Sequence, residues 1–157
     1  MVYLVDASFF VFRAYHSMPA DMADREGRPV GALYGFARFL SDFLERTRAE
    51  RVAVAFDESL TSSFRNRLYP PYKAHRELPP LELKEQFARC RELCRLLGLR
   101  EYGSAEYEAD DIIGTLAARM RAAGLPSTIV TRDKDLAQLI REGDQFWDWM
   151  AEERYGY

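Results

Sequence analysis

The stretch Glu106-Tyr107-Glu108-Ala109-Asp110-Asp111 places four carboxylates within six residues, directly before an apolar run with helical spacing. Carboxylates this close repel one another, and a position beside a core helix would push one or more of them toward protonation unless a cation lies among them. The stretch therefore predicts a divalent-metal site at the start of a helix that runs to Ala123 and is closed by Gly124.

Three apolar runs rich in β-forming residues lead into aspartates elsewhere in the chain. Continuous apolar runs of this length are typical of strands that are buried on both faces of a parallel sheet. The runs and their aspartates are Val2–Val5 with Asp6, Arg51–Phe56 with Asp57, and Ser127–Thr131 with Asp133.

Helical patterns alternate with these strands, and the alternation predicts an α/β fold with a doubly wound, mainly parallel sheet flanked by helices. Leu99–Tyr102 is too short and too charged to be assigned as a strand. The remaining expected elements are a helix from Phe9 to Ala14, a loop over Ser17–Pro29, helices over Gly31–Arg48 and Leu81–Leu97, a short helix around Leu136–Ile140, and a last strand at Gln145–Trp149.

Ligands of such sheets bind beyond the carboxyl ends of the strands. Asp6, Asp57 and Asp133 all lie at these ends, and Asp110 and Asp111 begin a helix at the same edge of the sheet. Each aspartate alone could be an ordinary turn or helix-capping residue. Their joint placement predicts one carboxylate site.

The composition describes a folded globular protein of one domain, with 48% hydrophobic and 30% charged residues. No apolar run approaches the roughly 20 residues that span a membrane, and no signal peptide begins the chain. Cys90 and Cys94 lack the partners of a zinc site, so we expect core cysteines and a cytoplasmic protein. We also expect a monomer.

The net charge of -3 conceals a basic segment. Thr61–Arg100 carries nine Lys and Arg against four Glu, which fits an anionic polymer as partner or, equally, a solvated helix face. Between Thr61 and Glu77 the cations alternate with aromatic residues, a mixture that can hold phosphate and stack on bases. Prolines interrupt this segment, so we expect an excursion from the sheet rather than one continuous helix.

An all-carboxylate site selects Mg²⁺ or Mn²⁺, since these ions prefer oxygen ligands. The two histidines, His16 and His75, are not near the strand ends in this pattern. Two such ions can bind a scissile phosphate, activate a water and stabilise the leaving oxygen, which makes phosphodiester hydrolysis the natural reaction. A glycine-rich phosphate loop is absent from the sequence.

Several motifs together carry a specific family resemblance. They are L-V-D-A-S at residues 4–8, A-F-D at 55–57, F-R at 64–65, Y-K-A-H-R at 72–76, Y-E-A-D-D at 107–111 and T-R-D-K-D-L at 131–136. In their order and spacing, the chain resembles the N-terminal, PIN-like domain of the bacterial 5′–3′ exonucleases, which are related to the nuclease domain of DNA polymerase I and to the flap endonucleases.

The resemblance implies a divalent-metal-dependent nuclease that cleaves DNA at 5′ ends and flaps, with RNA in RNA/DNA hybrids as a further substrate. It assigns the first metal cluster to Asp6, Asp57, Glu108, Asp110 and Asp111, and ligands of a second ion to Asp133 and Asp135. Glu106 is not required by the motif, and we expect it to be a solvent-facing turn residue.

The same resemblance implies a helical arch over about 61–80 that embraces a 5′ single strand. It gives Lys73 and Arg13 catalytic roles as active-site cations, and the residues expected to bind nucleic acid are Arg13, Arg65, Tyr72, Lys73 and Arg76. The family continues into a helix-three-turn-helix region that grips duplex DNA. The sequence stops at Tyr157, before any such region, so we expect 1–157 to be the N-terminal domain without it.

Two other functions remain open at this point. The chain could bind metal and a 5′ strand without catalysis, or it could be a PIN-like nuclease of single-stranded RNA. The long basic excursion with Y-K-x-x-R favours the flap-type nuclease, because a compact RNA-cleaving relative would not need it.

Overall fold

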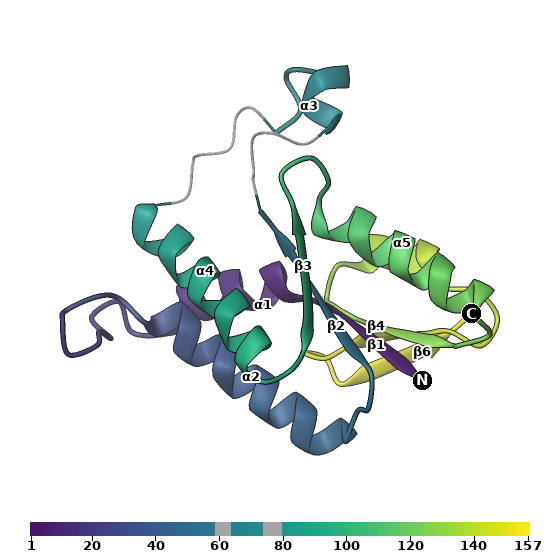
Figure 1. Ribbon diagram of the computed structural model, residues 1–157, viewed down its shortest axis with the longest axis horizontal. Helices are drawn as coiled ribbons and strands as arrows, with labels where there is room; N and C mark the ends of the chain where they lie inside the picture. The colour runs from purple at the N-terminus through teal and green to yellow at the C-terminus, as the bar shows by residue number, and fades with distance from the viewer. Residues whose placement is uncertain (59–63, 74–79) are drawn as a thin grey trace.

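The computed structural model describes residues 1–58, 64–73 and 80–157. Its elements confirm the predicted alternation of strands and helices (Figure 1). In chain order they are β1 (Val2–Asp6), α1 (Ala7–Ser17), α2 (Gly31–Thr47), β2 (Val52–Asp57), α3 (Phe64–Leu68), α4 (Leu81–Leu96), β3 (Arg100–Ser104), α5 (Ala109–Ala122), β4 (Ser127–Val130), the 3₁₀ helix η1 (Lys134–Leu139), β5 (Gln145–Asp148) and β6 (Glu153–Gly156).

The six strands form one sheet in the order β3-β2-β1-β4-β5-β6. The first five pair in parallel, and β6 pairs antiparallel to β5. β1 therefore lies inside the sheet, and the chain winds outward from it in both directions. This is the predicted doubly wound arrangement.

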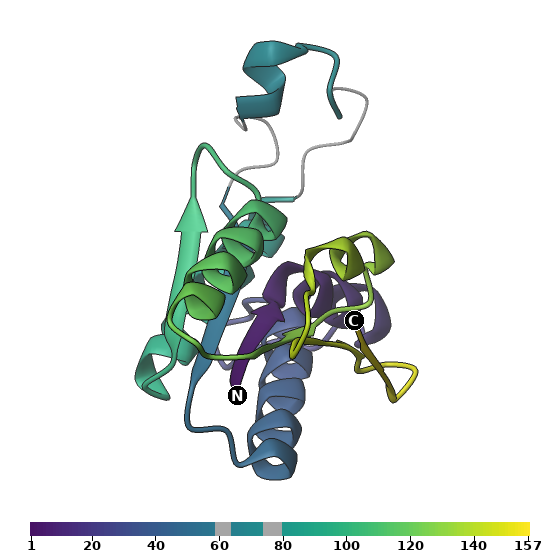
Figure 2. The ribbon, with the colours of Figure 1, turned by 90° about the vertical axis from the view of Figure 1, so that its right-hand side faces the viewer.

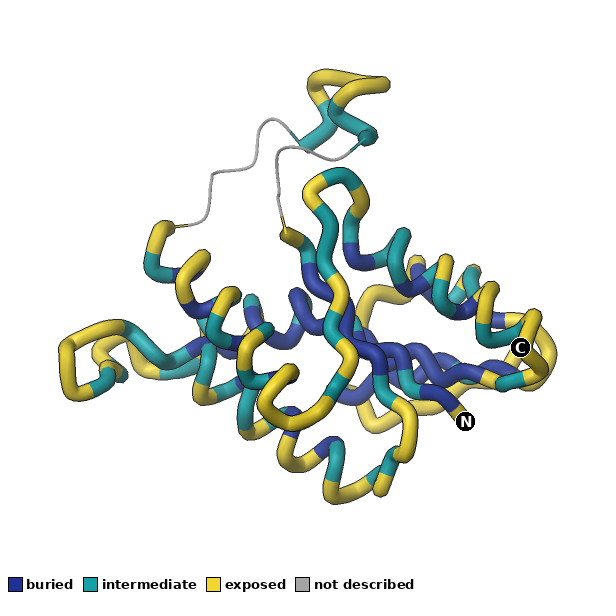
Figure 3. Tube along the Cα trace, in the orientation of Figure 1, coloured by how far each residue is buried: buried dark blue, intermediate teal, exposed yellow. Residues whose placement is uncertain are grey.

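Helices cover both faces of the sheet, and each face has its own apolar core (Figures 1 and 3). α1, α2 and α4 pack on one face around Phe36, Phe43 and Phe56, all fully buried. α5 and η1 pack on the other face around Ile113 and Ile129. Because alternate residues of a strand point to opposite faces, each central strand supplies both cores.

β3 and β6, the two edge strands, were not predicted, and both carry an exposed polar sequence. β3 has charged residues at its start, and Glu101 is held by hydrogen bonds from Arg91 and Arg95 of α4. All four residues of β6 are exposed, although the Arg154 guanidinium stacks on the Trp147 ring. An edge strand buries little apolar surface, so its pattern resembles that of a loop.

The predicted excursion after β2 falls partly outside the described residues, which omit 59–63 and 74–79. Within 64–73, α3 is only five residues long and has no buried residue. It lies beyond the carboxyl edge of the sheet, next to the loop between β3 and α5, as Figure 2 shows from a second side. The backbone N–H of Phe64 donates to the Glu106 carbonyl across 2.7 Å.

In the described part of the chain, no helix combines the length and the apolar character that crossing a membrane requires.

α1 and α2 approach so closely that their contact depends on a glycine. A Cβ atom added at Gly35 of α2 would lie 2.5 Å from the Cβ of Ala14 on α1, a distance that real Cβ atoms do not reach. Ala14 has no flexible side chain that could move aside. The helices themselves would have to separate.

Gly35→Ala should therefore destabilise the protein by about 1–3 kcal/mol, since overpacking outweighs the gain in helix propensity. Gly114→Ala in α5 is the matched control, because its added Cβ would meet only the Leu139 side chain at 3.4 Å. We expect that control to be neutral or stabilising by up to about 1 kcal/mol. Denaturant unfolding measures both, and equal stability of the two variants would contradict the packing argument.

Candidate metal centre

The alternation of side chains along the strands brings Asp6, Asp57 and Thr131 to one place. In β1 and β2, Leu4 and Ala55 face the α5 core, so the residues two positions later, Asp6 and Asp57, face the same way at the strand ends. Thr131 follows Ile129 of β4 by the same step. All three lie at the carboxyl edge on the face where α5 begins.

The start of α5 adds Glu108, Asp110 and Asp111. One ligand oxygen from each lies within 4.8 Å of the others, so the three could hold one metal ion. Glu108 is the N-cap of the helix, and its backbone N–H donates to Asp111 Oδ2 across 3.0 Å. The positive end of the helix dipole favours negative charge at these positions, which offsets part of the mutual repulsion.

Asp6 is the most strongly perturbed carboxylate of the site. Its Oδ2 accepts a 2.8 Å hydrogen bond from the Thr131 hydroxyl. Burial raises its pKa to about 7, and the charges of Asp57 and Asp133 act in the same direction, whereas the bond from Thr131 opposes them. Asp6 is the N-cap residue of α1, and the backbone N–H of Phe9 in the first turn also lowers the pKa of its carboxyl.

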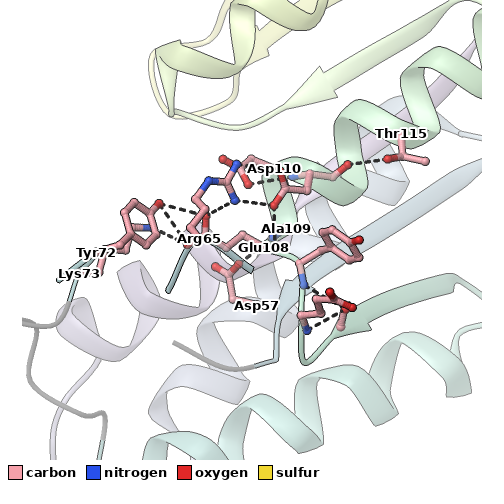
Figure 4. A network of polar contacts seen from close by, with 12 residues as sticks. Asp57, Arg65, Tyr72, Lys73, Glu108, Ala109, Asp110 and Thr115 are labelled. Carbon is pink, nitrogen blue, oxygen red and sulfur yellow. Dashed lines mark hydrogen bonds and ion pairs between the residues drawn. The ribbon is translucent and has the colours of Figure 1, made fainter. Parts of the chain in front are cut away.

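Asp57 is held between α1 and α5. Its Oδ1 accepts the backbone N–H of Ala109 at 2.7 Å (Figure 4). Its own N–H donates to the buried Ser8 hydroxyl at 2.8 Å. Burial raises the pKa of Asp57, and the Glu108 charge adds to the rise, while the Ala109 N–H and the Lys73 charge oppose it. The Asp57 carboxylate is thus held in place, but burial destabilises its ionised form.

Residues 64–73 bring two cations directly onto the carboxylates of α5 (Figure 4). Arg65 forms a two-pronged pair with Asp111, at 2.6 and 2.8 Å, and also contacts Glu108 at 2.9 Å. Lys73 Nζ donates to Glu108 Oε1 at 2.7 Å, and the Tyr72 hydroxyl donates to Oε2 at 3.2 Å. These contacts compensate charge within the cluster.

The pKa values of Asp110 and Asp111 are shifted in opposite directions. Burial acts to raise the pKa of Asp111, but the hydrogen bonds from Arg65 and from the Glu108 backbone outweigh it, so the pKa lies below its ordinary value. Burial and then the charges of Asp111 and Glu108 raise the pKa of the neighbouring Asp110. The repulsion within the cluster therefore raises the pKa of Asp110, whereas at Asp111 the pairing with Arg65 outweighs it.

The other predicted site residues lie farther out. Asp133 precedes η1, accepts the Asp135 backbone N–H at 3.0 Å, and is close enough for its charge to raise the pKa of Asp6. Asp133 and Asp135 are both exposed. Glu106 pairs with the exposed Arg67 and makes no described contact with the carboxylate cluster, as expected for a turn residue.

Arg13, a further predicted cation, is not among the described residues that contact the carboxylates. Arg13 is exposed on α1 and lines a hollow of about 710 Å³ between α1, α2 and Trp149. None of the ion pairs among the described residues links it to the cluster. Arg76 lies outside the described residues.

Two hydroxyl residues of the site were missed by the sequence prediction. Ser8 supports the backbone of Asp57, and Thr131 binds the carboxylate of Asp6. The period of two along β4 would have found Thr131, because it places this side chain on the face of Ile129 and beside Asp6. No comparable pattern marks Ser8.

The donor set fits a hard divalent cation. Octahedral Mg²⁺ needs ligand oxygens roughly 3–4 Å from each other, and the oxygens of Glu108, Asp110 and Asp111 lie within 4.8 Å. Burial raises the pKa values of Asp6, Asp57 and Asp110, and the charges of neighbouring carboxylates add to each rise. A divalent cation beside these side chains would favour their ionised forms.

Solved structures share the fold. A structure of T5 5′-exonuclease with divalent metal ions (zinc) bound aligns with a TM-score of 0.69 and 19% identity, covering 99% of this chain and 57% of that one. A complex of the bacteriophage T5 D15 flap endonuclease with DNA and metal ions aligns with a TM-score of 0.68 and 17% identity, covering 99% and 57%. At these identities the likeness shows the fold alone.

The chain belongs to the family described as the 5′-3′ exonuclease, N-terminal resolvase-like domain, which matches residues 1–156. DNA polymerase I of Rhizobium leguminosarum is 40% identical over 162 residues, covering 99% of this chain and 16% of that protein. DNA polymerase I of Streptococcus pneumoniae serotype 4 is 43% identical over 143 residues, covering 88% and 16%. The chain thus spans about one sixth of the length of these curated relatives.

Without divalent metal, the stability of the protein should fall as the pH rises from about 4 to about 7. The folded state raises the pKa of Asp6 to about 7, so folding favours the protonated carboxyl, and this contribution is lost as Asp6 ionises. Its size is up to roughly 4 kcal/mol. Asp57 and Asp110 act with the same sign.

Asp6→Asn should make this pH dependence shallower, because an amide does not titrate. Denaturant unfolding in the presence of a chelator measures the slope, with Asp21→Asn on the exposed loop as the control. An unchanged slope in Asp6→Asn would show that Asp6 is not the perturbed group.

Proposed function

We propose that this chain is a divalent-metal-dependent 5′–3′ exonuclease and 5′-flap endonuclease domain that hydrolyses phosphodiester bonds in DNA. The observation that carries the proposal is that Asp6, Asp57 and the carboxylates at the start of α5 lie at one edge of the sheet. Arg65 pairs there with Asp111, and Lys73 pairs with Glu108. Family membership and the similarity to DNA polymerase I support the same function.

The carboxylates would hold the metal, with Mg²⁺ or Mn²⁺ as the preferred ions. Divalent ions at such a site supply positive charge that binds a scissile phosphate and favours ionisation of the attacking water. The first ion would be held by Asp6, Asp57, Glu108, Asp110 and Asp111. A second ion would use Asp133, whose charge acts on Asp6, and Asp135, which follows in the same turn.

The cations of residues 64–73 would then act on the substrate. Arg65 and Lys73 are bound to the same carboxylates that a metal ion would use, so the two kinds of positive charge compete. Cations displaced from the carboxylates would remain within reach of a phosphate at the site, and Tyr72, which carries a cation–π contact from Lys73, would offer a ring for stacking on a base. We assign the same phosphate-binding role to Arg13 and Arg76 on the family resemblance.

The proposed substrates are DNA with 5′ ends or flaps and, secondarily, RNA/DNA hybrids. Residues 61–80 would form the arch that surrounds a 5′ strand, and the protein would act as a monomer. The two free cysteines are buried in the α4 core, which fits a reducing cytoplasm.

Asp110→Asn combined with Asp111→Asn should abolish cleavage of a labelled 5′-flap DNA in Mg²⁺ or Mn²⁺. Both substitutions keep the shape of the side chains while removing the charges that would bind metal. Gel analysis of flap DNA, duplex DNA and single-stranded RNA, each with either metal and with chelator, identifies the substrate and the metal requirement.

Asp21→Asn combined with Glu50→Gln is the control, because these exposed carboxylates lie outside the site. Metal-dependent cleavage that survives in the Asp110 and Asp111 double variant would refute the proposal. Binding of the flap without any cleavage by the parent would favour the non-catalytic module, and cleavage of the RNA alone would favour the RNA nuclease.

Lys73→Ala should weaken flap binding and lower its dependence on salt by about one released counterion. Its ammonium group is partly exposed and pairs with Glu108, from which it would move to reach a phosphate. Binding measured by fluorescence anisotropy across a salt series gives the slope. Arg67→Ala is the comparison, since Arg67 pairs with Glu106 outside the cluster, and a slope for Lys73→Ala equal to that of the parent would exclude the phosphate contact.

A further inference from the structure

Thr131 joins two groups of carboxylates that come from different strands. It is completely buried at the end of β4. Its Oγ1 lies 2.8 Å from Asp6 Oδ2 and 3.0 Å from the backbone nitrogen of Asp133. A single hydroxyl thus contacts the carboxylate that ends β1 and the residue that begins the Asp133–Asp135 turn.

The direction of both hydrogen bonds is fixed by chemistry. The backbone N–H of Asp133 can only donate, so the hydroxyl must accept it with a lone pair. The single hydroxyl proton is then directed to Asp6, whose carboxylate accepts it. When Asp6 is ionised, as a metal ligand would be, this bond is shorter and stronger than one between neutral groups, and the Thr131 hydroxyl then fixes the orientation of the Asp6 side chain.

The backbone of Thr131 is itself held in the sheet. β1 and β4 are neighbours, with Val5 opposite Val130, so Thr131 is adjacent to Asp6 in the next register position. The Thr131 N–H donates to the Trp147 carbonyl at 3.2 Å. The backbone that carries the hydroxyl is consequently held between β1 and β5.

We propose that Thr131 is a positioning residue that sets Asp6 and the Asp133–Asp135 turn in one arrangement, so that the two groups of carboxylates bind divalent metal together. This role rests on the proposed metal-dependent function. The hydroxyl does not touch the substrate; it acts through the two aspartates.

Substitution of Thr128 provides the control for this role, because Thr128 is a buried threonine without a described contact to the carboxylates. It lies in β4, three residues before Thr131, and is equally buried, but among the described residues its hydroxyl bonds to the Met1 sulfur alone, at 3.1 Å. Replacing either residue by valine removes a hydroxyl and keeps the shape and the β-branched side chain. The two substitutions therefore differ mainly in whether the lost hydroxyl served the carboxylates.

The first measurement is Mn²⁺ binding to the whole chain without DNA, followed by electron paramagnetic resonance of the free ion. Thr131→Val should weaken Mn²⁺ binding by about tenfold or more, as is usual when a partner that orients a metal ligand is lost. Thr128→Val should bind Mn²⁺ as the parent does. Equal affinity of Thr131→Val and the parent would overturn the proposal, as would an equal loss in Thr128→Val.

A second pair of variants covers the case in which Thr131→Val does not fold. Thr131→Ser keeps the hydroxyl and Thr131→Ala lacks it, so the two differ from each other only in that group. Mn²⁺ affinity should be retained in the serine variant and lost in the alanine variant. Similar affinities in the two would also overturn the proposal.

Cleavage kinetics give an independent readout. In a chain that cleaves flap DNA, Thr131→Val should need more Mg²⁺ for half-maximal rate and should lower kcat, with KM for the flap unchanged. A parent that binds Mn²⁺ but cleaves nothing would refute the proposed function alone, because the Mn²⁺ comparison still tests Thr131. A parent that binds no Mn²⁺ would refute both.

Discussion

Repulsion between carboxylates is the constraint on which the rest of this structure depends. The fold places Asp6, Asp57 and the aspartates of α5 at one edge of the sheet, where burial and proximity make their charges costly. Two large apolar cores, one on each face of the sheet, hold the strand ends together in spite of that cost. The helix dipole of α5 and the cations of residues 64–73 compensate part of the charge, and the remainder favours a divalent ion.

The residues that hold the carboxylates in place are far apart in the sequence but close together in the structure. Asp57 is fixed by the Ala109 backbone and by Ser8, and Asp6 by Thr131. Each of these hydrogen bonds joins two different elements, so the position of each carboxylate is set by the packing of strands and helices and not by a local loop. A rigid sheet edge of this kind can hold metal ligands in a defined geometry without a dedicated binding loop.

The sequence predicted the central strands and helices, and it predicted that Asp6, Asp57 and the start of α5 share one edge of the sheet, for identifiable reasons. Apolar strands that end in aspartate reveal both the parallel sheet and the edge at which its side chains converge. The edge strands β3 and β6 escaped prediction because Arg100 and the exposed residues of β6 bury too little surface to leave an apolar pattern. The pairing of Arg65 with Asp111 could not be predicted, since it joins residues 46 positions apart through a segment without hydrophobic periodicity.

Because of that pairing, the segment 64–73 and the proposed metal ligands are thermodynamically coupled. Arg65 and Lys73 reach Asp111 and Glu108 directly, so a ligand that draws these cations away leaves the carboxylates with more negative charge and a higher affinity for metal. Linkage requires the converse with equal strength: a metal ion that neutralises the carboxylates weakens their hold on the segment. An anionic strand and a divalent cation would therefore promote each other's binding without touching, through the loss of one set of ion pairs.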